Sequence, residues 1–378
     1  MDKFGVRKVF FWQRLVSPHI SGLAVALAEQ GCEVVYAAVQ PLTRERVEQG
    51  WSLPSLDGVR VELVPTLDAA LRLIDRSPLD FIHICSGVRG NGLIGDVQRL
   101  LAQRRLRHWI IIETVDDSGW RGFVRRFFYR WSFAIWQQTG EGVLAIGNST
   151  LAWMSARGVL PFRLFPFAYF LSSPLIASCE SYRGIGRFRI LFVGQFIELK
   201  RLDHLVGALA GVPHLDFELA VVGSGPLEGQ WRNIAEAALP GRVDWIGRLP
   251  LENVPAEMAR ADCLVLPSRH DGWGAVVSEA LMVGTPVICS DACGSSGVVR
   301  SSRHGGVFPV GDVRSLARLL AEIISKGRLR AEERSALASW AVCLGGQAGA
   351  HYLLEIFRHM DGAAERPVPP WAAAREAV

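Results

Sequence analysis

The fold of this 378-residue chain is decided by residues 263–280, CLVLPSRHDGWGAVVSEA. The first four residues are apolar and predict a buried strand. A Gly-X-Gly turn follows at Gly272 and Gly274, and a helical pattern begins at Ala275. A strand, a glycine turn and a helix in this order are typical of a Rossmann-like α/β unit.

The turn between this strand and this helix has the features of a diphosphate site. Glycines allow backbone N–H groups to approach a ligand closely, and a helix N-terminus adds the positive end of its dipole. Asp271 precedes the turn and Glu279 lies about one turn into the helix, so both carboxylates could accept hydrogen bonds from sugar or ribose hydroxyls. An ordinary strand–turn–helix with a helix-start acid explains the segment equally well when it is considered alone.

Three other turns of the same half favour the ligand-binding interpretation, because each ends an expected strand. They are Gly194, followed by Lys200; the glycine-rich turn at Gly223; and Gly247 with Arg248. The carboxyl ends of parallel strands meet at one edge of a sheet, where ligands bind in open α/β folds. We therefore expect these turns to surround one ligand.

Strand and helix patterns alternate along both halves of the chain. In the first half we expect strands at 9–12, 33–38, 59–64, 81–85, 109–114 and 142–146, and helices at 19–30, 67–75, 91–105, 120–137 and 149–157. In the second half we expect strands at 189–193, 217–222, 243–246, 263–266 and 286–289, and helices at 201–209, 227–238, 254–260, 275–283, 313–325, 329–344 and 345–360. Apolar strands separated by amphipathic helices predict parallel sheets covered on both faces.

This alternation predicts two Rossmann-like, doubly wound α/β domains that face a central cleft. An acceptor-side domain is expected over residues 1–170 and a donor-binding domain over 187–344, joined by a linker at 171–186 that is rich in Pro, Ser and Gly. Residues 345–366 would form a helix that can cross back to the first domain. The Pro- and Ala-rich residues 367–378 are expected to be a flexible tail.

Composition excludes several other classes of protein. The chain is 49% hydrophobic and 21% charged, which indicates a globular rather than a disordered protein, and a net charge of +4 is too small to argue for nucleic acid. The seven cysteines are scattered, and Cys289 and Cys293 have no second pair at ligand spacing, so no metal is expected. The sequence shows no signal-peptide pattern and no apolar run of about 18 residues, which predicts a cytoplasmic protein.

The stretch from about residue 189 to 325 resembles the donor domain of the retaining, GT-B-fold glycosyltransferases of family 4. Asp271 and Glu279 match the acid-x7-acid motif of that family, with Asp in place of the usual Glu, and the glycine turns match as well. The Asp-Gly-Trp-Gly version resembles a subset that builds bacterial surface polysaccharides. The first half of the chain resembles the family only in outline.

The resemblance implies a role for each matching position. Asp271 would hold hydroxyls of the transferred sugar, Glu279 would hold the ribose, and Lys200 would neutralise the diphosphate as it leaves. Gly247 and Arg248 would frame the base. The remaining donor contacts implied are Gly194, Gln195, Gly223, Ser268, Gly272, Trp273, Gly274, Ala275 and Val276.

Gln195 departs from the family pattern. The family usually places an arginine at this position to pair with the phosphates, and glutamine brings no charge. Either Arg201 or Arg269 compensates, or the donor binds more weakly.

The acceptor side of the sequence is less informative. The loop after the first strand lacks the glycine-rich sequence that many family members have. His83, inside the fourth expected strand, either contacts the donor sugar or acceptor, with a catalytic role, or is a hydrogen-bonded core residue. His19, Glu113 and Asp116 are the acceptor candidates, and Asp117 is expected to cap the following helix.

The expected helix from Trp120 to Gln137 has an aromatic arc opposite an arginine arc. One interpretation, which the sequence favours, buries the aromatic arc in the core and leaves the arginines exposed. The other places the helix on an anionic bilayer as a peripheral contact with the inner face of the plasma membrane.

The resemblance implies a retaining, metal-independent hexose transfer. The donor would be a UDP- or GDP-sugar, and the acceptor would be lipid-linked or a saccharide, in the synthesis of a bacterial capsule, exopolysaccharide or O-antigen. A nucleotide-sugar epimerase or hydrolase of the same fold is one alternative. A catalytically weak partner subunit is another, and Gln195 and the missing glycine loop are its support.

Overall fold

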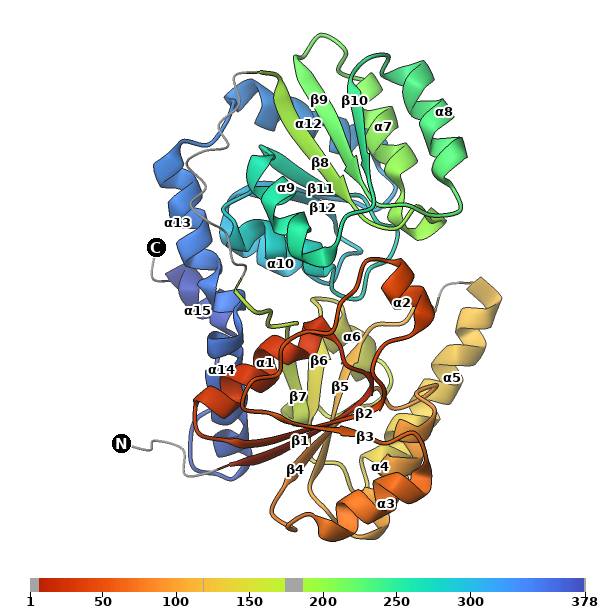
Figure 1. Cartoon of the computed structure of the whole chain (residues 1–378), viewed down its shortest axis with the longest axis vertical. Coiled ribbons are helices and arrows are strands. Elements are labelled where there is room, and N and C mark those ends of the chain that lie inside the picture. The colour runs from red at the N-terminus through yellow and green to blue at the C-terminus, as the bar shows by residue number, and fades with distance from the viewer. Residues whose placement is uncertain (1–6, 118, 174–185, 377–378) are drawn as a thin grey trace. The chain divides into compact units, whose positions relative to one another are not determined.

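The computed structural model describes residues 7–117, 119–173 and 186–376. Most of the expected linker, residues 174–185, lies outside the described residues. The chain divides into two compact units, the first made of Met1–Val47, Leu53–Ser172 and Leu344–Pro370, and the second of Glu48–Ser52, Ser173–Cys343 and Trp371–Val378. Each unit is built on one parallel sheet with helices on its faces (Figure 1).

Within the described residues, the sheet of the first unit has seven strands in the order β3-β2-β1-β4-β5-β6-β7. The strands are β1 (Lys8–Leu15), β2 (Glu33–Gln40), β3 (Arg60–Leu63), β4 (Ile82–Ser86), β5 (His108–Glu113), β6 (Val143–Ile146) and β7 (Leu164–Phe167). Its helices include α1 (Pro18–Glu29), α2 (Arg44–Glu48), α3 (Leu67–Arg76), α4 (Leu93–Gln103), α5 (Gly119–Trp136) and α6 (Thr150–Ser155). Strand β7 was not predicted, because its four residues include Pro166, which a parallel sheet accommodates at its edge.

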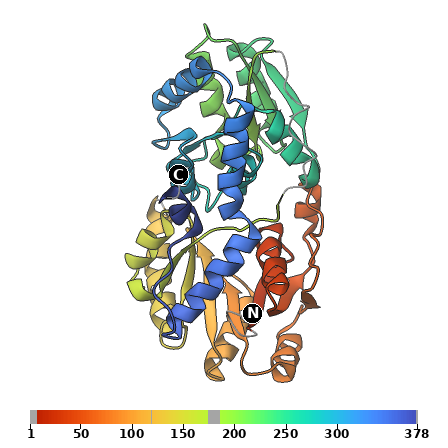
Figure 2. The same ribbon diagram turned by 90° about the vertical axis from the view of Figure 1, so that its left-hand side faces the viewer.

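Helix α14 (Gly346–Met360) belongs to this first unit although it comes after the second in sequence. It packs along α1, as the blue and red helices of Figure 2 show. The contact is close, because a Cβ on Gly346 would lie 2.3 Å from the carbonyl oxygen of Gly22. The backbone of Leu171 also pairs with the start of α14, accepting a hydrogen bond from the Gly346 N–H at 2.9 Å.

In the part of the second unit that the structure describes, the sheet has six strands in the order β10-β9-β8-β11-β12-β13. The strands are β8 (Phe188–Val193), β9 (Phe217–Val222), β10 (Val243–Gly247), β11 (Cys263–Leu266), β12 (Val287–Ser290) and β13 (Gly305–Phe308). Its helices include α7 (Leu202–Ala210), α8 (Glu228–Ala238), α9 (Val254–Arg260), α10 (Ala275–Met282), α11 (Ser296–Ser302), α12 (Val313–Lys326) and α13 (Ala331–Ala341). Two parallel-sheet, Rossmann-like domains confirm the predicted fold class.

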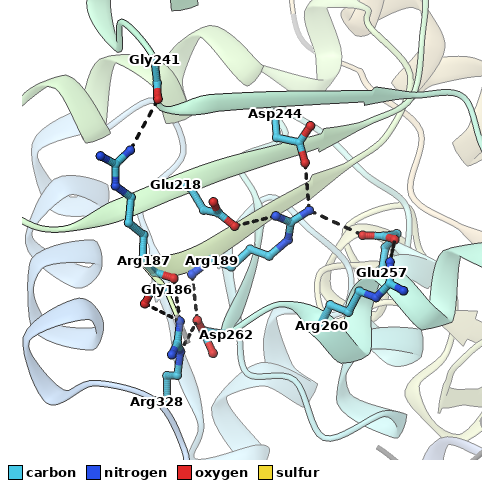
Figure 3. A network of polar contacts seen from close by, with 10 residues as sticks. All are labelled: Gly186, Arg187, Arg189, Glu218, Gly241, Asp244, Glu257, Arg260, Asp262 and Arg328. Atoms are coloured by element: carbon cyan, nitrogen blue, oxygen red, sulfur yellow. Dashed lines mark hydrogen bonds and ion pairs between the residues drawn. The ribbon is translucent and has the colours of Figure 1, made fainter. Parts of the chain in front are cut away.

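An ion-pair network fixes the amino ends of the strands in this second sheet (Figure 3). Arg189 in β8 pairs with Glu218 in β9 at 2.5 Å and with Asp244 in β10 at 3.1 Å. The Asp262 carboxylate accepts from the Arg189 N–H at 2.8 Å and from Arg328 at 3.0 Å. This charged cluster lies at the opposite ends of the strands from the glycine turns, so its role is structural.

The expected flexible tail is in part a helix, α15 (Pro370–Glu376). Pro370 begins it, a position where proline costs no hydrogen bond. Trp371 then packs on Trp273 of the second unit, with ring centroids 6.2 Å apart. The prediction of a flexible tail was wrong over these residues, because it followed the Pro- and Ala-rich composition and gave no weight to one large aromatic side chain.

Helix α5 also differs from the favoured prediction. Its aromatic arc faces outward, whereas Tyr129, Phe133 and Trp136 on the opposite side pack in the core with Met154. Both sides of this helix carry large apolar residues, so periodicity alone could not identify the buried one. Gly122 lies on the buried side, where a Cβ would overlap the carbonyl oxygen of Asp117.

No helix in the described part of the chain is both long enough and apolar enough to cross a bilayer.

Candidate functional site

The glycine turns after β8, β9 and β10 lie next to one another, as predicted. The Gly194 N–H donates to the carbonyl of Val222 at 3.1 Å, and the Gly223 N–H donates to the carbonyl of Gly247 at 2.9 Å. Gly223 has φ = 137°, and a Cβ there would lie 1.9 Å from the Gly194 carbonyl oxygen. Only glycine permits this approach, so the turns form a surface of closely packed backbone.

Lys200 and Asp271 form an ion pair beside these turns. The Lys200 Nζ lies 2.6 Å from the Asp271 Oδ2, and the two side chains are 23% and 13% exposed. The backbone supports the pair, because the Arg269 N–H donates to the carbonyl of Leu199 at 2.7 Å. Two residues that are 71 positions apart in sequence, both predicted to be catalytic, are therefore brought into contact.

The turn at Gly272 to Gly274 leads directly into α10. Gly274 is left-handed, with φ = 83°, and a Cβ there would lie 2.8 Å from a methyl carbon of Leu266. No side chain caps the start of α10. The first turn of this helix, with Ala275 and Val276, thus has the arrangement in which helix N-termini bind anions.

Trp273 stabilises this turn through its buried side chain and its backbone. Its side chain is buried, and its indole N–H donates to the Ser278 Oγ at 3.1 Å. Its carbonyl accepts from the Ser295 N–H at 2.9 Å. Any contact of Trp273 with a ligand in this conformation would therefore be made by its backbone.

A second loop, residues 291–295 between β12 and α11, was not predicted to belong to the site. The Gly294 N–H donates to the Asp271 carbonyl at 2.9 Å, so this loop lies against the acidic turn. Within the described residues, the buried hydroxyls of Ser268, Ser295 and Ser296 have no hydrogen-bond partner. Buried polar groups normally have one, and the only sequence signal for this loop was its place after a strand of the same sheet.

Glu279 lies in the second turn of α10. Burial raises the pKa of its carboxyl group to about 7, from an ordinary value of 4.5. The group is therefore present in both protonation states near neutral pH. The carboxylate form accepts hydrogen bonds from hydroxyls, and the acid form can also donate one.

The two arginines proposed to compensate for Gln195 differ in their contacts and exposure. Arg201, a left-handed residue, donates to both carboxylate oxygens of Asp203, at 3.0 and 2.7 Å. Arg269 is exposed on the turn that follows β11. Arg248 donates to the Ser224 Oγ at 3.1 and 2.9 Å, which places its guanidinium at the turn after β9.

His83 does not have the surroundings of a catalytic residue. It is 1% exposed, and its Nδ1 accepts a hydrogen bond from the Trp12 indole at 3.0 Å. Burial lowers its pKa to about 3, which keeps the ring neutral. These surroundings favour the core interpretation over the catalytic role, because the ring packs against Phe10 and Trp12 and is shielded from any ligand in this structure.

Two of the acceptor candidates lie together at the carboxyl edge of the first sheet. The His19 ring stacks on Tyr169, with centroids 4.9 Å apart, and the Tyr169 hydroxyl donates to Glu113 at 2.8 Å. Tyr169 was missed by the sequence analysis. Asp116 lies further on, in the loop before α5, where its carbonyl accepts from Arg125.

Asp117 in the same loop is not the predicted helix cap. Its carboxylate accepts from the Trp153 indole at 3.0 Å and also binds Arg157. It therefore fixes the loop to α6. The described residues contain no group of three or more His, Cys, Asp or Glu side chains placed to hold a metal ion.

Comparison with known proteins matches mainly the second half of the chain. Residues 184–339 match the family model described as "Glycosyl transferases group 1". The 2-deoxystreptamine glucosyltransferase of Streptomyces kanamyceticus is 31% identical over 164 residues, 43% of this chain and 42% of that protein. The amylovoran biosynthesis glycosyltransferase AmsK of Erwinia amylovora is 30% identical over 144 residues, 36% and 35%.

The matched region thus spans less than half the length of each of these relatives. The structure of Anabaena HepE in complex with UDP covers 94% of this chain and all of that one, with a TM-score of 0.68 and 14% identity. This likeness shows the fold alone. Residues 184–339 are therefore similar to group 1 glycosyl transferases, and the rest of the chain is covered only by the likeness in fold to solved structures.

Proposed function

We propose that this protein transfers a hexose from a UDP- or GDP-sugar to a lipid-linked or saccharide acceptor in the synthesis of a bacterial surface polysaccharide. The observation that carries the proposal is the Lys200–Asp271 pair beside the uncapped start of α10. A cation, a helix N-terminus and a carboxylate in one place fit a diphosphate joined to a sugar. The UDP bound to HepE and the amylovoran relative support the donor and the product class.

The residues divide the reaction between them. Lys200 exchanges its carboxylate partner for the diphosphate and stabilises the charge that develops as the sugar–oxygen bond breaks. Asp271, released from that ion pair, accepts hydrogen bonds from hydroxyls of the sugar, and Glu279 accepts them from the ribose. The turns at Gly194 and Gly223 and the start of α10 surround the phosphates.

The new glycosidic bond forms on the face from which the diphosphate leaves. The acceptor oxygen attacks the anomeric carbon, the bond to the diphosphate breaks, and the acceptor proton passes to the departing phosphate. The anomeric configuration is retained, and no metal takes part. An inverted product, or loss of activity in EDTA, would contradict this mechanism.

The cluster of His19, Tyr169 and Glu113 is the proposed acceptor region. Aromatic rings stack on sugar faces, and a carboxylate binds sugar hydroxyls. The protein is proposed to act in the cytoplasm, at the inner face of the plasma membrane.

The proposal is tested by measuring nucleoside diphosphate release from UDP- and GDP-sugars, with and without an extract of bacterial glycolipids. We expect release that depends on the extract and that is lost in Lys200→Ala and Asp271→Ala. Release at an equal rate without any acceptor would favour a hydrolase, and conversion of the donor into a different nucleotide sugar without release would favour an epimerase. A chain that binds no donor, and whose two variants leave glycan synthesis in cells unchanged, would instead be a partner subunit.

A further inference from the structure

Helix α5 presents a row of large apolar side chains to solvent. Trp120, Phe123, Phe127 and Trp131 are 75%, 69%, 66% and 58% exposed. Val124, Phe128 and Ile135 on the same helix are exposed as well. At 100° per residue all seven fall within one arc, which we call the α5 aromatic face. An exposed apolar surface of this kind marks a site of interaction.

The α5 aromatic face is not the side of the helix that packs in the core of this unit. The helix already contributes its other side to the core through Tyr129, Phe133 and Trp136. Its orientation is held by Arg126, whose guanidinium donates to the Asp117 carbonyl at 3.0 Å. The aromatic side chains therefore face outward while the helix is fully packed on its unit.

Arginines lie along both borders of this face. On the helical wheel, Arg125 lies at one border and Arg126 and Arg130 at the other, and all three are exposed. Arg126 lies over the Phe123 ring at 5.9 Å, and Arg89, in the loop between β4 and α4, lies over Phe128 at 4.4 Å. The helix contains no acidic residue. Along the helix, an apolar centre is thus combined with a cationic margin.

We propose that the α5 aromatic face docks on the surface of an anionic lipid bilayer. Aromatic residues with arginines at their flanks are typical of helices that lie in the membrane interface, where the rings enter the acyl boundary and the cations meet phosphates. The 18 residues of α5 span about 27 Å, which is long enough to lie along a membrane. A second copy of this chain fits less well, because two α5 faces would bring arginines against arginines.

The test is co-sedimentation of the whole chain with vesicles of phosphatidylglycerol and phosphatidylcholine, compared with vesicles of phosphatidylcholine alone. We expect binding to the first kind, weakened by high salt. The triple variant Phe123→Ser, Phe127→Ser, Trp131→Ser should lower the partition coefficient on the order of 100-fold. The variant Arg89→Gln, Arg130→Gln leaves the Arg126 contact intact and should lower it roughly 25-fold, and only for anionic vesicles.

A matched control is Leu63→Ser, Leu79→Ser, which removes exposed apolar side chains elsewhere in the same unit. It should bind vesicles as the native chain does. The proposal is overturned if the triple variant binds like the control, or if ultracentrifugation shows a dimer that the triple variant abolishes while vesicle binding is absent. Binding is measured without any nucleotide sugar, so its outcome is independent of the proposed transferase activity.

Discussion

Lys200 and Asp271 are each other's partner in this structure, and this has consequences for how a donor would bind. The pair is largely shielded from solvent, so separating it without a new partner for each charge would be costly. A diphosphate offers Lys200 a stronger anion, and a sugar offers Asp271 hydroxyl donors. Binding of an intact donor would thus satisfy both residues, whereas a free sugar or a free phosphate would satisfy only one.

The first prediction concerns Lys200. Replacing it with methionine should lower the rate of sugar transfer by about 10²- to 10³-fold, because the charge that develops on the leaving diphosphate loses its cation. The measurement is kcat with saturating donor. Lys326→Met, which removes an exposed lysine at the end of α12, is the matched control and should change kcat little. A Lys200→Met enzyme within threefold of the native rate would remove this residue from the mechanism.

The second prediction uses the raised pKa of Glu279. The unfolded chain releases this proton near pH 4.5 and the folded chain near pH 7, so folding stability is lost as pH rises from about 4.5 through 7. The loss is at most about 3 kcal/mol. Glu279→Gln cannot titrate, so its free energy of unfolding should fall less over that interval.

Urea unfolding at pH 5 and pH 8 measures this difference. Glu236→Gln, at an exposed position on α8, serves as the control and should follow the native pH dependence. If Glu279→Gln also showed the native pH dependence, burial of the Glu279 carboxyl group would not be the cause of the lost stability.

At the scale of elements, strands with long apolar runs were easier to predict than strands that proline or glycine interrupts. Long apolar runs such as Phe217–Val222 are found where the sequence predicted them. β7 and β13 were missed because Pro166, Gly305 and Gly306 interrupt the apolar pattern. The glycine at 305 is required, since a Cβ there would lie 1.9 Å from the Val287 carbonyl oxygen, but close packing between strands is not visible in a sequence.

The third prediction concerns α15. Because Trp371 packs on Trp273, and the carbonyl of Trp273 accepts from Ser295, removal of the Trp371 ring should loosen the turn at Gly272 to Gly274. We expect Trp371→Ala to weaken nucleoside diphosphate binding by roughly 3- to 10-fold, which is about 1 kcal/mol. Trp371→Phe should recover most of the loss.

Titration calorimetry measures this effect, with Val368→Ala as the control, since Val368 is an exposed residue of the same tail. Equal affinities for Trp371→Ala and Val368→Ala would show that α15 does not support the donor turn.

The fourth prediction concerns the ion-pair network of Figure 3. Arg189→Ala leaves Glu218, Asp244 and Glu257 close together without their shared cation. The free energy of unfolding should fall by about 2 kcal/mol, with sugar transfer by the folded protein unchanged. Arg187→Ala, which breaks a far more exposed pair with Asp216, should cost less than about 0.5 kcal/mol. Similar losses in the two variants, measured by urea unfolding, would argue against the network.

At the scale of the whole molecule, the candidate site was predicted best where several strands end together. Gly194, Gly223 and Gly247 could be placed side by side because topology requires it. Lys200 and Asp271 were expected at the same edge of the sheet, but their direct contact was not predicted. His83 and the aromatic side of α5 could not be assigned, since each pattern had two physically sound interpretations. Ser295 and Tyr169 gave no signal, because their importance comes only from what the fold brings next to them.

The central claim is that the turns around Asp271 bind a nucleotide sugar. The most direct measurement is the thermal unfolding midpoint of the whole chain in the presence of UDP, GDP and their sugars, since a ligand at 100 times its Kd stabilises by about 2.7 kcal/mol. We predict that UDP or GDP and a sugar of the same base raise the midpoint in the native chain. The rise should be lost in the double variant Lys200→Ala, Glu279→Ala. A native chain that none of these compounds stabilises, or a double variant stabilised equally, would contradict the account.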